Sequence, residues 1–178
     1  IPRPERTAEN TVDPTYTREP TQDGERQVTL RRVGDVQLIN AVYHVPPGSH
    51  EDFAAISILA HAMGNSPSGR LYKALVEPKL ASSAGSFGYQ LREPGVMVFS
   101  ATVRKEDSIE QARDVLLRTV EEAGSTEFTE EEVERARAAI LRSWELSYNS
   151  TERVALQLSE WAAMGDWRLM FIHRDRIR

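Results

Sequence analysis

Two stretches between residues 26 and 45 predict a β-hairpin. Val28, Leu30 and Arg32 alternate with polar neighbours, as residues of a half-buried strand do. Gly34-Asp35 separates this stretch from residues 36–45, and a two-residue connection of this composition is typical of a hairpin. Residues 36–45 are apolar on both faces, which predicts a strand inside a sheet.

Residues 49–78 predict two helices. Ser49 is placed to cap the first, which Gly64 ends. Four apolar residues fall on one face of that helix: Phe53, Ile56, Ala60 and Met63. The second helix follows the turn at 67–69, and Pro78 ends it. Its buried stripe is expected to contain Leu71 and Leu75.

The rest of the chain predicts a second hairpin and then helices. Residues 84–91 and 96–103 read as strands on either side of Glu93-Pro94-Gly95. Three helical segments follow, beginning after Ser108, after Thr129 and after residues 149–151. Strands joined by hairpins and followed by helices predict an α+β fold, with an antiparallel or mixed sheet and helices packed on one face.

Composition narrows the class of protein. The 178 residues, of which 40% are apolar, suffice for one domain with a core. A net charge of −5 argues against a nucleic-acid partner, and no apolar run is long enough to span a membrane. The absence of cysteine excludes disulfides, thiol nucleophiles and thiolate zinc sites.

The N-terminal segment differs from the rest. Residues 1–25 contain four prolines and few apolar residues, which predicts an extended linker, or a strap anchored by Tyr16. The predicted domain covers residues 26–178. Because the chain begins at Ile1 without methionine and ends without a helix stop signal, we expect a piece of a longer protein, truncated at the C-terminal end of the domain.

The residues themselves yield no catalytic or metal site. The four histidines are His44, His50, His61 and His173. None has a second ligand at helical spacing, so we interpret His61 as a histidine beside a core helix and His173, among arginines 168–178, as a solvated tail residue. The acidic clusters 121–122 and 130–132 are interpreted as structural, since the second lies in the first turn of a capped helix.

A serine cluster offers one enzymatic alternative. Ser82-Ser83 and Gly85-Ser86 could include a nucleophile, although no G-x-S-x-G elbow is present. An enzyme of an unrelated class with its site in residues 82–88 therefore stays open.

A resemblance to a known family goes further. The segments that carry it are Gly48-Ser49-His50-Glu51-Asp52-Phe53, Ile58-Leu59-Ala60-His61-Ala62-Met63-Gly64, Ser68-Gly69-Arg70-Leu71-Tyr72 and Gly95-Val96-Met97-Val98-Phe99. Together with the element order, they resemble the C-terminal-type subdomain of the pitrilysin/insulinase family of zinc metallopeptidases, the inverzincins. The resemblance covers about residues 26–178 and implies one half of the LuxS/mitochondrial-processing-peptidase-like fold.

The resemblance implies a mechanism for the whole family. Two similar halves form a chamber in which peptides are cleaved. The first subdomain carries H-x-x-E-H, whose histidines hold zinc and whose glutamate activates water. Residues at i and i+4 share a helical face, which is why the inverted motif works.

This sequence departs from the family pattern at both known sites. Matched to the metal helix, it reads Ser57-Ile58-Leu59-Ala60-His61, so one histidine at most survives and this segment is expected to hold no zinc. The family's Arg–Tyr pair, which binds substrate carbonyls, is matched by Val76 and Ser83. We therefore predict no catalytic and no metal-binding residue here.

The resulting hypothesis is a non-catalytic, chamber-forming subdomain of a larger zinc metalloendopeptidase that degrades peptides. Its expected partners are the zinc-bearing subdomain of the same chain, which holds the zinc cofactor, and the peptide substrate. The alternative is a scaffold or interaction protein of the same fold without proteolysis, as in the core subunits of the respiratory cytochrome complex. Bacterial relatives of this type are commonly exported, so a periplasmic location is expected.

Overall fold

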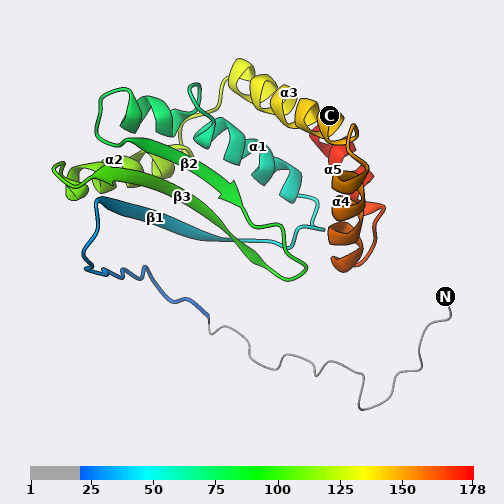
Figure 1. Cartoon of the computed structure of the whole chain (residues 1–178), viewed down its shortest axis with the longest axis horizontal. Helices are drawn as coiled ribbons and strands as arrows, with labels where there is room; N and C mark the ends of the chain where they lie inside the picture. Colours follow the sequence, from blue (N-terminus) through cyan, green and yellow to red (C-terminus); the bar gives the residue numbers. More distant parts are fainter. Residues whose placement is uncertain (1–20) are drawn as a thin grey trace, which may run out of the picture. The chain divides into compact units, whose positions relative to one another are not determined.

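The computed structural model of the protein describes residues 21–178. The chain divides into two units, Ile1–Val33 and Gly34–Arg178. The predicted strap, Tyr16 included, lies mainly outside the described residues. Figure 1 shows the helices and strands of the second unit, whose bounds are given below.

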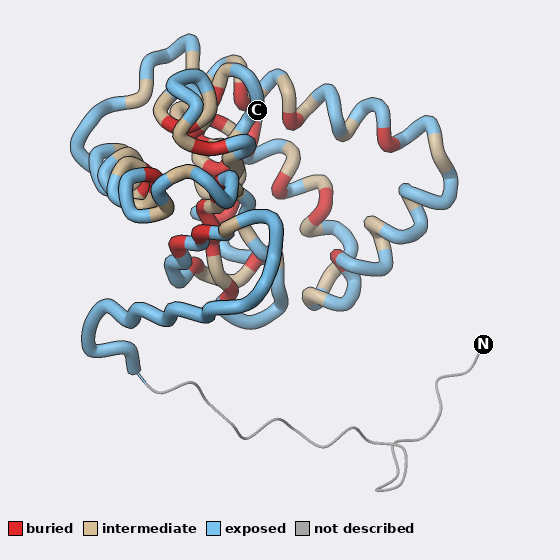
Figure 2. Tube along the Cα trace, turned by 60° about the vertical axis from the view of Figure 1, so that its left-hand side comes forward, coloured by how far each residue is buried: buried red, intermediate tan, exposed pale blue. Residues whose placement is uncertain are grey.

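Residues 21–33 of the first unit contain neither helix nor strand and are exposed throughout (Figure 2). The predicted strand at Val28–Arg32, and with it the first hairpin, is therefore wrong. Val28 and Leu30 are 81% and 78% exposed. Alternation of apolar and polar residues favours a strand only where a neighbouring strand can pair with it.

The second unit contains a three-stranded antiparallel sheet in the order β1-β3-β2. Its strands are β1 (Val36–Val45), β2 (Ser83–Gly88) and β3 (Gly95–Arg104). In the register, Ile39 of β1 and Ala84 of β2 both lie opposite Ala101 of β3. The second hairpin is confirmed. Among the described strands β1 is an edge and β3 is central, so the placement of residues 36–45 inside the sheet is wrong.

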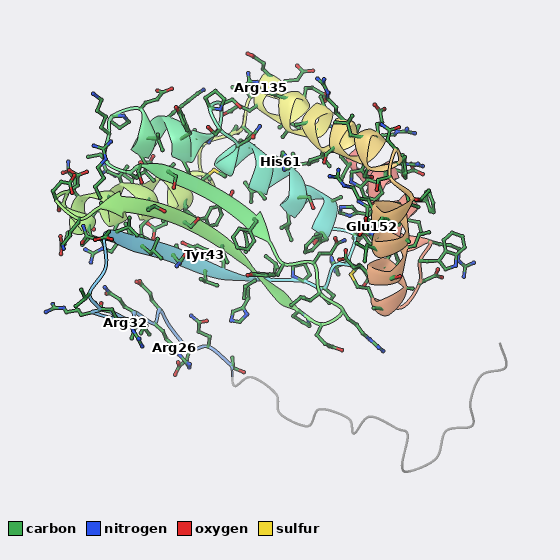
Figure 3. All side chains as sticks on the ribbon, in the orientation of Figure 1. Arg26, Arg32, Tyr43, His61, Arg135 and Glu152 are labelled. Atoms are coloured by element: carbon green, nitrogen blue, oxygen red, sulfur yellow. The ribbon has the colours of Figure 1, made fainter. Side chains whose placement is uncertain are left out.

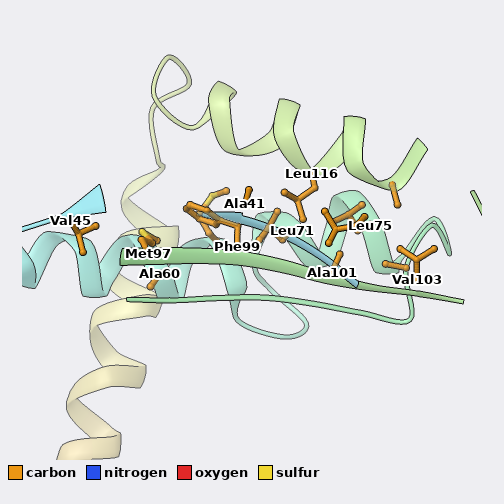
Figure 4. Packing of buried hydrophobic residues seen from close by; sticks show 14 of the residues in the cluster. Ala41, Val45, Ala60, Leu71, Leu75, Met97, Phe99, Ala101, Val103 and Leu116 are labelled. Carbon is orange, nitrogen blue, oxygen red and sulfur yellow. The ribbon is translucent and has the colours of Figure 1, made fainter. Parts of the chain in front are cut away.

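Three helical elements cover one face of this sheet: α1 (Phe53–Gly64), the short π-helical turn η1 (Tyr72–Val76) and α2 (Ile109–Glu122). Side chains from these elements interdigitate with the inward positions of β1 and β3 (Figure 4). Met63, Leu71, Leu75, Leu116 and Val103 are fully buried. The α1 stripe and the η1 stripe are thus confirmed, although α1 begins at Phe53 with Asp52, and not Ser49, before it.

The remaining helices pack on α1 and on one another: α3 (Glu130–Ser147) lies along α1, α5 (Leu169–Ile177) contacts α1 and α3, and α4 (Thr151–Ala163) contacts α5. The side chains of Ser108, Thr129 and Ser150 cap α2, α3 and α4, and the capping box at Thr129–Glu132 is confirmed. The sequence interpretation missed α5. Met170, His173 and Ile177 form its buried stripe, and counting the histidine as polar hid that spacing. The predicted α+β class is confirmed.

Candidate functional site

In the α1 segment matched to the metal helix, Ser57–His61, two of the positions that replace metal-site residues contact protein backbone. The Ser57 hydroxyl donates to the carbonyl of Phe53 at 2.9 Å. Ala60 is buried, and its carbonyl accepts a hydrogen bond from the Ser86 hydroxyl of β2 at 2.7 Å. One turn later a Cβ on Gly64 would lie 2.2 Å from the backbone nitrogen of Ser86. The end of α1 therefore packs directly on the β2 backbone.

His61 occupies a different side of α1, toward α3 (Figure 3). It lines a cavity of about 10 Å³ together with Asn65, Ser68, Glu132 and Arg135. That volume holds about one water molecule. Partial burial lowers the pKa of the His61 imidazole, which favours its neutral form. The interpretation of His61 as a residue flanking the core helix agrees with this position.

The other histidines lie on separate elements. His44 is on β1, and His50 is in the turn before α1, where its Nδ1 accepts from the Asp52 backbone N–H at 3.2 Å. Across residues 21–178, no group of three or more His, Cys, Asp or Glu side chains could hold a metal ion.

The prediction that His173 is a solvated tail residue is wrong. It is 7% exposed and lies among three aromatic rings. Its ring centroid is 5.3 Å from Trp161, 6.0 Å from Phe53 and 6.4 Å from Trp144. Burial, with a smaller effect of the Arg176 charge, lowers the pKa of His173 to about 4. Neutral His173 therefore acts as a packing residue that joins α5 to α1, α3 and α4.

The serine cluster ties strands and helices together. The Ser82 hydroxyl donates to the Thr102 carbonyl at 3.0 Å, and Ser86 donates to Ala60 as described. A serine nucleophile instead needs a base that accepts its proton. Ser83 is the exposed first residue of β2, opposite Thr102, and Val76 is the last residue of η1. The positions matched to the Arg–Tyr pair thus lie at the end of η1 and the start of β2.

An ion pair that the sequence analysis did not identify fixes η1 to α3. The Arg70 guanidinium donates from Nε and Nη2 to the two carboxylate oxygens of Glu132, both at 2.9 Å. It also donates to the carbonyls of Thr126 and Glu127 and stacks on the Phe128 ring at 3.7 Å. The hydrogen bonds from Arg70 to the carboxylate, with smaller effects from the Thr129 backbone N–H and hydroxyl, lower the pKa of Glu132 to about 2. The pair spans 62 residues of sequence, so helical spacing could not reveal it.

Among residues 21–178, no helix packs on the sheet face opposite α1, η1 and α2. In the register, β1, β2 and β3 present their even, odd and even positions to it, respectively. Leu38, Val42 and Phe87 on this face are 65%, 54% and 45% exposed. This is why residues 36–45 are apolar on both faces without being an interior strand.

None of the helices within residues 21–178 combines the length and the apolar character that a membrane span requires.

Comparison with known proteins identifies the family. The model of the peptidase M16 inactive domain matches residues 2–140. A relative, the zinc protease PqqE of Helicobacter pylori, is 29% identical over 129 residues, which are 71% of this chain and 29% of the relative. The chain thus spans less than a third of that relative's length.

Two crystal structures show the same architecture. The inactive peptidase domain of a protein from Bordetella parapertussis, assigned as a zinc protease, superposes with a TM-score of 0.76 at 42% identity, covering 85% of this chain and 82% of that one. A protease from Helicobacter pylori gives a TM-score of 0.75 at 21% identity over 81% and 35% of the two chains, and so supports the fold alone. With the family model matching most of its length, the chain belongs to the M16 peptidase family, as an inactive domain of that family.

Proposed function

We propose that this chain is the non-catalytic, chamber-forming subdomain of a larger zinc metalloendopeptidase that degrades peptides. The observation behind this proposal is the sheet: helices cover one face, and the other, over which no helix of the described part of the chain lies, carries exposed apolar residues. We place that open face toward the chamber, where a peptide would lie. The catalytic zinc and its H-x-x-E-H helix are assigned to another subdomain of the longer polypeptide.

The packing around α1 supports a structural role. Ser57, Ala60 and Gly64 face or approach protein backbone, which leaves no open coordination position on that side of the helix. The domain would contribute to proteolysis by shaping the space around the substrate. Its own side chains would neither activate water nor bind the metal.

The experiment compares the longer polypeptide with residues 1–178 alone. The longer polypeptide is expected to cleave unstructured peptides only when loaded with zinc, whereas residues 1–178 with zinc cleave none. Replacing the motif glutamate in the zinc-bearing subdomain should abolish cleavage without unfolding. Cleavage by residues 1–178 alone would contradict the proposal. Failure of the zinc-loaded polypeptide to cleave any peptide would favour the alternative, a scaffold of the same fold.

We also propose a periplasmic location. A protease from Escherichia coli described as periplasmic, PqqL, shares the fold with a TM-score of 0.65 at 12% identity. Cell fractionation followed by detection of the full-length protein tests this proposal, and its recovery with cytoplasmic markers would contradict it.

A further inference from the structure

The open face of the sheet has no charged side chain over most of its area. Four ranks of side chains cross it, each with one residue from β1, one from β3 and one from β2 or its continuation. The ranks are Leu38–Thr102–Ser83, Asn40–Ser100–Gly85, Val42–Val98–Phe87 and His44–Val96–Tyr89. None of these residues is Asp, Glu, Lys or Arg, although 28% of the chain is charged. Arg104, at the end of β3, provides the first charge beyond them.

Apolar and aromatic side chains occupy one half of this face. We call Val42, Phe87, Tyr89 and Val98 the open-face patch. The rings of Phe87 and Tyr89 meet edge to face with centroids 5.0 Å apart. Phe87 and Tyr89 are 45% and 48% exposed. Val98 is only 8% exposed although no helix within residues 21–178 covers it, because Val42 and Phe87 flank it in the same rank.

The other half of the face carries small and polar residues. Asn40 and Thr102 place an amide and a hydroxyl group there, and the Ser100 hydroxyl donates to the Gly85 carbonyl at 3.4 Å. The face therefore offers apolar contact at one end and neutral hydrogen-bonding groups at the other. An extended peptide has the same two requirements, since its side chains can be apolar while its backbone must be hydrogen-bonded.

We propose that the open-face patch binds apolar or aromatic side chains of peptide substrates that lie across the sheet. This inference rests on the proposed function, since it takes the chamber as the source of the peptide. A patch of four side chains is large enough to contact one or two residues of a peptide. A stable interface between subunits needs about 20–30 residues from each side, far more than the patch offers. A neutral face also gives charged segments of a peptide no ionic partner, so the patch selects for apolar sequence.

The test uses the zinc-loaded longer polypeptide and two fluorogenic peptides of equal length with the same scissile sequence. One peptide carries Leu and Phe in the residues flanking that sequence, and the other carries Ser and Asn. The variants are Phe87→Ser combined with Tyr89→Ser, the conservative Phe87→Leu, and Trp167→Ser as a matched control, since Trp167 is a half-exposed aromatic residue away from the sheet. Thermal unfolding of each variant verifies that its fold is intact.

For the double variant we expect KM for the apolar peptide to rise roughly tenfold, which corresponds to about 1.4 kcal/mol of lost binding. Its kcat should stay within about twofold, because the patch would hold the substrate equally in the ground state and the transition state. KM for the polar peptide should be unaffected, Phe87→Leu should retain a low KM for the apolar peptide, and Trp167→Ser should match wild type with both peptides.

The possible outcomes distinguish failure of this inference from failure of the proposed function. Unchanged KM for the apolar peptide in the double variant overturns the inference while leaving the proposed function intact. A monomer–dimer shift in the double variant with unchanged KM also overturns it, in favour of a second copy of the chain. A second readout does not require cleavage: a peptide carrying benzoylphenylalanine should photo-crosslink to residues 87–89. Crosslinking elsewhere overturns the inference, and crosslinking there without any cleavage supports the patch while contradicting the proposed function.

Discussion

The two faces of the sheet contain similar residues in very different surroundings. Phe99 points to the helices and is 4% exposed, whereas Phe87, one strand away, points to the open face and is 45% exposed. Buried apolar area stabilises a fold by about 25 cal/mol per Å², so the covered face carries the stability of the domain. The open face can vary its side chains at little cost, and that freedom suits a surface selected for binding.

The largest expected effect is that of replacing Phe99 on the covered face, compared with the same replacement of Phe87 on the open face. Phe99→Ala leaves a cavity between the sheet and the helices and should lower the free energy of unfolding by about 3–5 kcal/mol. The matched variant Phe87→Ala removes a half-exposed ring and should cost less than about 1 kcal/mol. Urea unfolding of both variants measures the difference. Similar losses in the two variants would show that the open face is covered in solution.

The packing of α3, α4 and α5 around the start of α1 also depends on a neutral histidine, His173. The pKa of His173 is lowered to about 4, so the unfolded chain binds a proton at higher pH than the folded chain does. Its contribution to stability is complete above about pH 6.5 and is lost as the pH falls toward 4. The loss should reach about 3 kcal/mol, from the size of that pKa shift.

Unfolding measured between pH 7 and 4 checks this contribution, with His173→Gln as the comparison. The variant should lose most of the pH dependence in that window because glutamine does not titrate, and His61, whose pKa is also lowered, accounts for the remainder. An equal pH dependence in the two proteins would show that another group, and not His173, is responsible.

A smaller effect is expected from the ion pair that fixes η1 to α3. The Arg70 and Glu132 side chains are 18% and 17% exposed, so solvent screens them only in part. Arg70→Met leaves the Glu132 carboxylate without its bidentate partner and should cost roughly 2–3 kcal/mol. The control is Arg135→Met, because Arg135 pairs with the exposed Glu131 on the same helix and should cost less than about 0.5 kcal/mol.

The pH dependence distinguishes this pair from His173. The pKa of Glu132 is lowered to about 2, so its contribution is present above about pH 4.5 and is lost as the pH falls from there toward 2. Arg70→Met should remove most of that dependence, since only the Thr129 hydrogen bonds to Glu132 remain, and should leave the His173 window unchanged. Equal stability of Arg70→Met and Arg135→Met would show that the bidentate geometry contributes nothing.

The sequence predicted the elements that depend on local signals. Side-chain caps at Ser108 and Thr129, the hairpin around Pro94 and the apolar stripe of α1 were all recognisable, because each depends on residues close together in the chain. The resemblance supplied the family and the expectation that Ser57 and Ala60 replace metal-site residues.

Errors arose where distant residues decide the environment. His173 is buried only because Phe53, Trp144 and Trp161, from three other helices, enclose it. The apolar residues of β1 predicted an interior strand, because the sequence cannot distinguish a buried face from an open apolar one. The same ambiguity concealed the open-face patch, whose members come together only through the register of three strands.

The smallest expected effect is that of zinc. A metal site filled at 100 times its dissociation constant would raise the free energy of unfolding by about 2.7 kcal/mol. The packing of Ser57 and Ala60 against protein backbone leaves His61 without the second ligand that the family's helix supplies. Thermal unfolding of residues 1–178 with and without zinc should therefore give the same Tm, and His61→Ala should respond identically. A rise in Tm that saturates at one equivalent of zinc, and that His61→Ala abolishes, would contradict the structural role assigned to α1. It would place a metal site at His61.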